Sequence, residues 1–392
     1  MSGPKIALQH WTRFIAVLGL LGGVFLTAGS TGAAASTWSV TPSPNEGVGF
    51  IDLSMVSCVT STHCVAVGSF TNASGVSQTL VETWDSGTWS ITPSPNQGGN
   101  DNELLGVSCT STTSCVAAGQ YTGHGTSSGR ALTLVEMLSG TRWSITPSAN
   151  PDRFGDDSLY SVSCISIDSC VAVGTHTHHG NPSKTLIESW DGTRWSVPAS
   201  PSPGTAINQL SGVSCTSSDS CMAVGYYIDS VPATFGTLTE FWDGTSWSVI
   251  SSVNPGTSNQ LNAVSCTNSE DCTAVGNYFN GSADQTLIES WDGGNWSMAP
   301  SPQEGESTNS LNGVSCSDAS DCVAVGVYTD ASSAAQTLIE SWSGTGWSVT
   351  ASPNKGSGSN YLNGVSCTGT NCIAMGFRDK GSSATRTLIE TD

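Results

Sequence analysis

The feature that most constrains this chain is a repeat whose seven copies follow one another with little between them. Each copy carries segments of the type L-x-G-V-S-C, C-x-A-V-G, T-L-I-E-x-W and W-S-V, in that order, as residues 261–302 illustrate, except that the last copy ends before its W-S-V segment. The V-S-C cysteines of successive copies lie 50, 51 or 55 residues apart. A fixed period of this length indicates a propeller or a solenoid.

The segments within each copy have the composition of β-strands. They are short, rich in Val, Ile, Thr and Trp, and separated by Gly, Asn, Asp and Ser. Extended windows with apolar residues at helical spacing do not occur. Four short strands fit one blade of a β-propeller, whereas a parallel β-helix needs shorter coils and a helical solenoid needs a helical period. We therefore expect an all-β fold, a seven-bladed β-propeller with four antiparallel strands per blade.

The two ends of the chain suggest how such a ring is closed. Residues 37–40 form a W-S-V segment with no repeat before it, and the last repeat stops at Asp392, where its own W-S-V segment is due. An incomplete last blade would leave a sheet edge open. We expect the N-terminal W-S-V strand to complete the last blade, so that residues 36–392 form a single domain.

Residues 1–35 are typical of a secretory signal peptide. Lys5 and Arg13 supply positive charge, residues 14–28 are apolar, and the alanines at 33–35 fit a cleavage site. The apolar run is shorter than the roughly 20 residues of a transmembrane helix. We expect a secreted, extracellular protein with no membrane span after signal cleavage.

Charge limits the possible partners. The chain has 31 acidic and 11 basic side chains, and a formal net charge of −20. Phosphate backbones are bound by clustered Lys and Arg, so a nucleic-acid partner is not expected. An anionic membrane surface is disfavoured for the same reason. We expect a monomer that binds a glycan or another exported protein.

The cysteines indicate a set of local disulfide bonds. All 14 fall into pairs, one pair in each repeat, six with the spacing C-x5-C and the last one residue shorter. In an exported chain this pattern favours disulfides across the turn between the first two strands, rather than zinc sites, which gather four ligands, or redox thiols. The expected bonds join Cys58 to Cys64, Cys109 to Cys115, Cys164 to Cys170, Cys215 to Cys221, Cys266 to Cys272, Cys316 to Cys322 and Cys367 to Cys372.

Residues present in every copy are candidates for the scaffold. The T-L-x-E segments carry one glutamate each, and a catalytic role would require one of them to differ from the others in its surroundings. Alternation along the strand places Leu287, Glu289 and Trp291 on one face, against a neighbouring blade. We expect Glu289 to accept hydrogen bonds there, and the tryptophans to fill the gaps between blades.

Two segments resemble a known motif. Residues 83–89 (TWDSGTW) and 189–195 (SWDGTRW) are similar to the Asp-box of sialidase-type propellers, although each is at least one residue shorter than S-x-D-x-G-x-T-W. The whole repeat, over residues 38–392, resembles those of uncharacterised secreted bacterial β-propeller proteins related to the kelch and Asp-box propellers. The resemblance implies the fold and no activity.

Variation among the copies indicates where a ligand site would lie. The connections between second and third strands differ, as residues 121–132, 175–184, 227–236 and 377–386 show, and so do the segments leading into the first strands. In a propeller both kinds of connection emerge on one face, while the nearly uniform cystine and W-D-G turns lie on the other. A binding site formed by these loops would produce this variation, and so would sequence drift in loops that are under no functional constraint.

Three groups of residues on that face are candidates for binding. The first is an acidic group, which either binds a hard cation such as Ca²⁺ or forms a solvated rim. No D-x-D-x-D-G loop, the usual calcium-binding pattern, occurs with it. Its members are Asp101, Glu103, Asp152, Asp156 and Asp157. A histidine group, in T-H-T-H-H-G, is a possible metal loop: His176, His178 and His179. Aromatic residues at the ends of second strands could form a rim: Tyr226, Tyr227, Tyr278, Phe279 and Tyr328.

Enzyme motifs are sparse, and no catalytic residue is assigned. A sialidase-like site needs three arginines, whereas Arg142 and Arg194 fall in turns of the uniform face. No H-E-x-x-H or phosphate-binding loop occurs. The sequence leaves open whether two of its carboxylates form a catalytic acid–base pair. The sequence favours an extracellular binding scaffold that holds a glycan or protein, with a polysaccharide hydrolase or lyase as the alternative.

Overall fold

The computed structural model describes residues 37–123, 129–151, 154–178, 181–230, 233–305, 307–381 and 384–392. The predicted signal peptide lies outside these residues. The described part of the chain forms 28 β-strands and no helix. Accordingly, the described residues include no helix of the length and apolarity that a membrane span requires.

The strands form seven units of four, which we number 1 to 7 in the chain order of their first strands. The first strands are β2 (Ile51–Thr60), β6 (Asn102–Ser111), β10 (Gly155–Ser166), β14 (Ile207–Ser217), β18 (Ser258–Asn268), β22 (Asn309–Asp318) and β26 (Asn360–Thr368). The second strands are β3 (His63–Thr71), β7 (Ser114–Gly123), β11 (Ser169–His178), β15 (Ser220–Ser230), β19 (Asp271–Phe279), β23 (Asp321–Thr329) and β27 (Asn371–Asp379). The third strands are β4 (Ser77–Asp85), β8 (Arg130–Ser139), β12 (Lys184–Trp190), β16 (Ala233–Trp242), β20 (Asp284–Trp291), β24 (Ala335–Trp342) and β28 (Thr385–Thr391). The fourth strands are β5 (Thr88–Ile91), β9 (Arg142–Ile145), β13 (Trp195–Ser196), β17 (Trp247–Ile250), β21 (Trp296–Ala299), β25 (Trp347–Val349) and β1 (Ser39–Val40).

Within each unit the strands pair antiparallel in the order first, second, third, fourth. Unit 7 takes its fourth strand from the other end of the chain, because Ser39 of β1 pairs with Thr391 of β28. Units 4 and 5 share one eight-stranded sheet through a single parallel bridge between Phe235 and Ser258.

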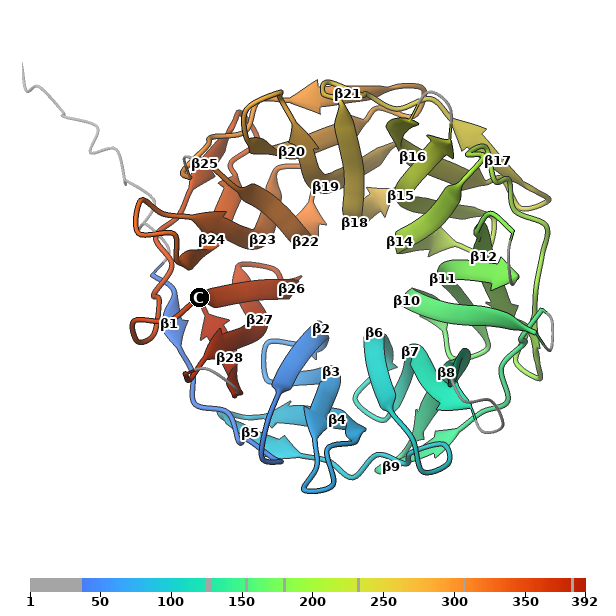
Figure 1. Ribbon diagram of the computed structural model, residues 1–392, viewed down its shortest axis with the longest axis vertical. Helices are drawn as coiled ribbons and strands as arrows, with labels where there is room; N and C mark the ends of the chain where they lie inside the picture. Colours follow the sequence, from blue (N-terminus) through green and yellow to red (C-terminus); the bar gives the residue numbers. More distant parts are fainter. Residues whose placement is uncertain are drawn as a thin grey trace, which may run out of the picture. The chain divides into compact units, whose positions relative to one another are not determined.

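Residues 37–392 place the seven units in chain order about a common centre, with the first strands innermost (Figure 1). The first strand of each unit packs against that of the next, and β26 of unit 7 packs against β2 of unit 1. The apolar core is divided among the spaces between neighbouring units. One such cluster joins Ile51 and Trp89 of unit 1 to Ile373 and Met375 of unit 7.

A disulfide bond closes the turn between the first and second strands of every unit, as the sequence predicts. The bonds join Cys58 to Cys64, Cys109 to Cys115, Cys164 to Cys170, Cys215 to Cys221, Cys266 to Cys272, Cys316 to Cys322 and Cys367 to Cys372. The paired cysteines face each other in the strand register, with Cα atoms 4.0 Å apart at Cys266 and Cys272. Seven such bonds indicate an oxidising, extracellular environment.

The serine of each V-S-C segment links one unit to the next. Its Oγ accepts a hydrogen bond from the backbone N–H of the following unit's V-S-C cysteine, at 3.0 Å in each case. The bond from Cys58 to Ser366 has this same length, although it joins unit 1 to unit 7. These bonds supply partners to backbone donors on the free edge of the innermost strands.

Candidate functional site

The strand register assigns the connections to two faces. Cys266 faces Cys272 at one end of the first strand pair in unit 5, and Ser258 faces Phe279 at the other end. The cystine turns and the turns before the fourth strands therefore lie on one face. The second-to-third connections and the segments leading into the first strands lie on the opposite face, which we call the variable-loop face. This arrangement agrees with the one expected from the sequence.

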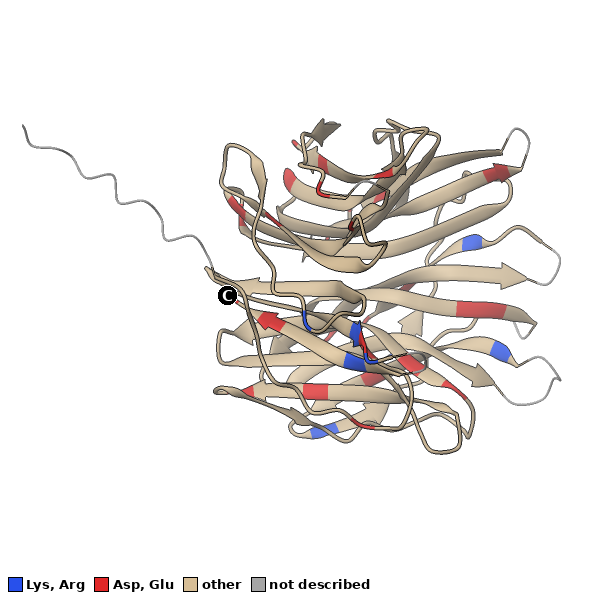
Figure 2. Cartoon of the chain, turned by 60° about the vertical axis from the view of Figure 1, so that its left-hand side comes forward, with Lys and Arg blue, Asp and Glu red and all other residues tan. Residues whose placement is uncertain are grey.

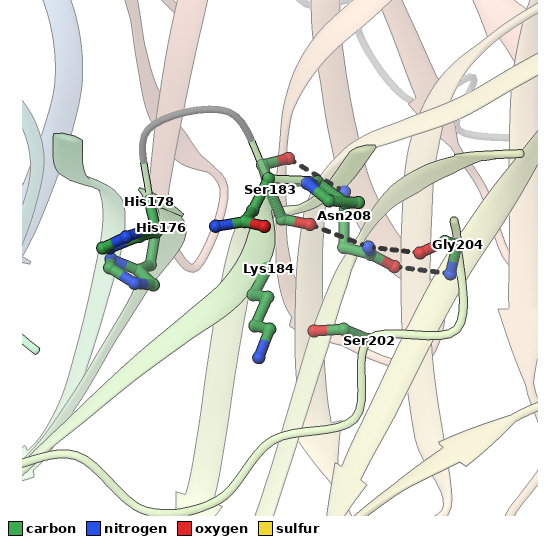
Figure 3. Close-up of a pocket in the computed structure, with 9 residues that line it drawn as sticks. His176, His178, Ser183, Lys184, Ser202, Gly204 and Asn208 are labelled. Atoms are coloured by element: carbon green, nitrogen blue, oxygen red, sulfur yellow. Dashed lines mark hydrogen bonds between the residues drawn. The ribbon is translucent and has the colours of Figure 1, made fainter. Parts of the chain in front are cut away.

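A pocket of about 590 Å³ opens on the variable-loop face between units 3 and 4. Its lining comes from the end of β11, the start of β12 with the residues before it, and the segment leading into β14: His176, His178, Asn181, Pro182, Ser183, Lys184, Ser202, Gly204 and Asn208. His176 and His178 lie on one side and Asn208 and Gly204 on the other, with Lys184 between them (Figure 3). None of these lining residues is acidic.

Asn208 fixes one wall of this pocket. Its buried side chain donates from Nδ2 to the carbonyl oxygens of Ser183 (2.9 Å) and Gly204 (2.8 Å), as Figure 3 shows. Its Oδ1 accepts a hydrogen bond from the N–H of Gly204 at 2.6 Å. The Oγ1 of Thr175 donates to its backbone carbonyl at 3.1 Å. Because unit 4 is tied in this way to the loop of unit 3, the wall exists before any ligand arrives.

On the other side of the pocket, His176 is held by a buried carboxylate. Asp157 on β10 is fully buried, and its Oδ1 lies 2.5 Å from His176 Nδ1. In the strand register Asp157 faces His176, and His176 faces Lys184 of β12. Residues directly opposite each other project from the same side of a sheet. A carboxylate, an imidazole and an ammonium therefore follow one another across three strands; we call these three residues the ionisable row.

Comparison with solved structures identifies the architecture. The structure described as YCF48 bound to D1 peptide has a TM-score of 0.54 and 13% identity, and the match covers 91% of this chain and 96% of that one. The WD40 β-propeller domain of Doa1 has a TM-score of 0.55 and 11% identity, with 91% and 97% covered. The fold is a β-propeller.

A third similar propeller is an enzyme. It is a polysaccharide lyase of family PL25, an ulvan lyase bound to -[GlcA(1-4)Rha3S]-, with a TM-score of 0.53, 10% identity, and 82% of this chain and 89% of that one covered. At such low identities these structures show the fold of this propeller alone. No family model and no curated protein matches the sequence.

The predicted acidic group does not come together as one cluster. Asp101 accepts a hydrogen bond from the N–H of Ser77, and Asp156 accepts one from the N–H of Ala131. Each carboxylate therefore fixes the third strand of the preceding blade of the propeller. Asp101 and Glu103 line a smaller pocket of about 280 Å³ between units 1 and 2. Asp152 lies outside the described residues.

The structure describes two of the three histidines of the predicted metal loop. His176 and His178 both line the pocket, whereas His179 lies outside the described residues. Among the residues that the structure describes, no three His, Cys, Asp or Glu side chains are placed to hold a metal ion. Calcium binding stays a prediction.

Three members of the predicted aromatic rim also belong to the apolar packing between blades. Tyr227, Tyr278 and Tyr328 are half-buried and pack against the apolar clusters between blades. These rings fill the space beneath the variable loops because they follow the buried C-x-A-V-G segment on the second strand. Tyr226 differs, since its hydroxyl donates to Gln209 at 3.3 Å.

The repeated glutamates are part of the scaffold of the propeller. All seven are fully buried: Glu82, Glu136, Glu188, Glu240, Glu289, Glu340 and Glu390. Glu289 accepts a hydrogen bond from the N–H of Val253 at 3.2 Å, and Glu240 accepts one from Ser200 Oγ at 2.8 Å. Burial raises the pKa of Glu289 to about 7 and that of Glu240 to about 8. Their similar surroundings give no one glutamate a distinct chemical role.

Proposed function

We propose that the chain is a secreted extracellular binding protein that holds a glycan in the pocket between units 3 and 4. In this proposal it is a seven-bladed propeller of the kelch and Asp-box type, closed by the pairing of β1 with unit 7. The observation that carries the function is the pocket itself, which two blades build from polar side chains on the variable-loop face. Export is supported by the signal-like residues 1–35 and the seven disulfide bonds.

The chemistry of the lining suits a sugar. The amide of Asn181, the hydroxyl of Ser202 and the ammonium of Lys184 offer donors and acceptors in one concave place. The volume of about 590 Å³ falls within the range of pockets that hold small ligands. The described residues of this lining include no Phe, Tyr or Trp, so hydrogen bonds from them rather than ring stacking would hold the ligand.

A glycan array with the folded mature protein tests this function, followed by titration of the glycans that bind. The variant Asn181→Trp places a large ring at the exposed rim of the pocket, and we expect it to abolish binding. The matched control is Ser282→Trp, on the exposed second-to-third loop of unit 5, which should bind as the parent does. A blank array, together with capture of an exported protein from the secreted fraction, would assign the face to a protein partner instead.

The ionisable row favours a second candidate function, a polysaccharide hydrolase or lyase. An imidazole oriented by a buried carboxylate is an arrangement that transfers protons in acid–base catalysis. His176 has this partner in Asp157, at 2.5 Å, and it lines the pocket. The ulvan lyase among the similar structures shows that a propeller can support such chemistry.

Incubation with a panel of polysaccharides distinguishes the two functions. Catalysis would produce new reducing ends, and a lyase would also produce unsaturated sugars that absorb ultraviolet light. His176→Ala should abolish either product. If a polysaccharide binds in the pocket and is never cleaved, the binding function stands and the enzymatic one is excluded.

A further inference from the structure

The other units provide an internal comparison for the ionisable row, because the strand register defines the same three positions in each of them. In four units the first two positions pair an asparagine with a tyrosine: Asn102 with Tyr121, Asn208 with Tyr227, Asn259 with Tyr278 and Asn309 with Tyr328. The third position is uncharged in five units: Gln78, Leu132, Gly236, Gln285 and Gln336. The common pattern is therefore a neutral one.

In the repeated pattern the asparagine has a structural role. In unit 5 the Oδ1 of Asn259 accepts a hydrogen bond from the N–H of Gly256 at 2.8 Å, and its Nδ2 donates to the carbonyl of Phe235 at 2.9 Å. It thereby fixes the segment that leads into the first strand. Unit 3 has Asp157 at this position, facing His176 where four other units have a tyrosine.

No other unit combines the three side chains of unit 3. Unit 7 has Asn360, Arg378 and Arg386, and unit 1 begins with Ile51. Among the described positions, an acid, an imidazole and an ammonium follow one another in unit 3 alone. This departure coincides with the pocket of about 590 Å³, because His176 and Lys184 both line it.

The arrangement of charge at the pocket favours an anion. Lys184 is exposed and lines the pocket beside two histidines, while the only acid of the row, Asp157, is buried beneath His176. The rest of the chain has the opposite character, with 31 acidic and 11 basic side chains in the whole sequence. Figure 2 shows how few Lys and Arg residues the chain carries. A basic lining on so acidic a protein selects ligands by charge.

We infer that this pocket recognises the anionic group of an acidic sugar, the carboxylate of a uronic acid or a sulfate ester. The inference rests on the proposed glycan-binding function and names its ligand class. Lys184 supplies the charged donor, and charge-assisted hydrogen bonds to carboxylate or sulfate are stronger than those to a neutral hydroxyl. Asp157 acts as a positioning residue, since it holds the ring of His176 against the pocket.

Calorimetric titration of the mature protein with three tetrasaccharides tests the inference: an oligogalacturonate, a sulfated carrageenan oligosaccharide and cellotetraose. We expect at least one anionic probe to bind about tenfold more tightly than neutral cellotetraose, and its affinity to fall as salt is raised from about 0.1 to 0.5 M. The anionic probe that binds more tightly identifies whether carboxylate or sulfate is the natural group.

Two variants connect this selectivity to the ionisable row. Lys184→Gln introduces the residue that units 1, 5 and 6 carry at this position, and it should reduce the preference for the anionic probe by about tenfold. The triple variant that combines D157N, H176Y and K184Q gives unit 3 the pattern of unit 5, Asn259, Tyr278 and Gln285, and should abolish the preference. An unchanged melting temperature for Lys184→Gln separates recognition from folding.

The charge-matched control is Lys380→Gln, an exposed lysine after the second strand of unit 7. It removes the same charge from the same face at another unit and should leave the anionic preference intact. An equal loss in Lys380→Gln and Lys184→Gln would show non-specific attraction and overturn the inference. Equal binding of all three probes would overturn the inference and keep the proposed glycan function. If none of the three probes binds and the glycan array is also blank, both fail.

Discussion

At the scale of single residues, the buried glutamates give the fold a dependence on pH. Burial raises the pKa of each repeated glutamate from 4.5 to about 7 or about 8. Hydrogen bonds from serines such as Ser94 oppose this shift without cancelling it. The folded protein therefore keeps protons that the unfolded chain releases.

Thermal stability should fall as pH rises from about 5 to about 8.5. Below the unfolded value of 4.5 the carboxyls are protonated in both states, so their contribution to stability is complete. Between that value and about 8 the folded state binds more protons than the unfolded state, and stability is lost with rising pH. Calorimetric melting temperatures across this range measure the effect. A melting temperature that rises steadily toward pH 8.5 would contradict it.

A matched pair of variants assigns the effect to burial. Glu240→Gln removes one of the titrating buried groups, and we expect its melting temperature to depend less on pH than that of the parent. Glu46→Gln changes an exposed glutamate that is not one of the seven buried ones and should leave the slope unchanged.

The serine of the V-S-C segment is a second residue whose contribution can be measured. Ser265→Ala leaves the N–H of Cys316 without its acceptor, and an unsatisfied partly buried donor costs roughly 1–3 kcal/mol. Chemical denaturation should show a lower free energy of unfolding. Ser297→Ala, which alters an exposed hydroxyl, is the control and should have no effect. Equal stability of the two variants would show that the bond between units adds nothing.

The sequence predicted some residue contacts and missed others. The seven cysteine pairs, from Cys58 with Cys64 to Cys367 with Cys372, were predictable because their spacing alone matches a tight turn between antiparallel strands. The pairing of Asp157 with His176 was missed, since the two residues were assigned to separate acidic and histidine groups. Its signal was an aspartate where most repeats have asparagine, opposite a histidine where four have tyrosine. That signal becomes visible only when the strand register aligns the copies.

At the scale of elements, β1 is short and yet tied to the fold in several ways. Trp38, next to it, is buried in the cluster between units 6 and 7 with Val325 and Leu388. The N–H of Thr41 donates to the carbonyl of Ile389 at 2.8 Å. The repeat pattern predicted this strand and its partner, while the depth of Trp38 in the core came from the structure.

Deletion of residues 37–42 should destabilise the protein far more than the removal of an ordinary terminal segment of the same length. It removes the pairing with β28 and empties the place of a buried tryptophan, a loss of several kcal/mol. We expect the melting temperature to fall by at least about 5 °C relative to a chain that begins at Thr37. Identical melting curves for the two chains would refute the role of β1 in unit 7.

At the scale of the whole molecule, we expect that the two chain ends could meet in any of the seven units without changing the strand pairs. In unit 5 the exposed residues 292–295 join the third strand to the fourth. In unit 7 the third and fourth strands, β28 and β1, pair although no short loop joins them. The pairing of a third with a fourth strand therefore does not require a direct covalent connection between them.

A circular permutant tests this equivalence. Joining Asp392 to Thr37 through Asp-Gly-Gly and opening the chain between Gly293 and Gly294 moves the break from unit 7 to unit 5. We expect the permutant to fold, with a melting temperature within about 5 °C of the parent, because the same strand pairs form. A permutant that melts much earlier would show that unit 7 has a special role in holding the fold.

The pairing of β1 with β28 also sets the order in which the fold is completed. Ser39 and Thr391 are 352 residues apart, whereas within the other units the strands that pair are close in sequence. Because a chain is synthesised from its N-terminus, β1 is present early and stays unpaired until the residues of β28 have been added. A contact so distant in sequence forms late and slowly. A chain that stops before β28 leaves β1 and β27 without their partner strand. This last strand pair forms only when every residue from Ser39 to Thr391 is present.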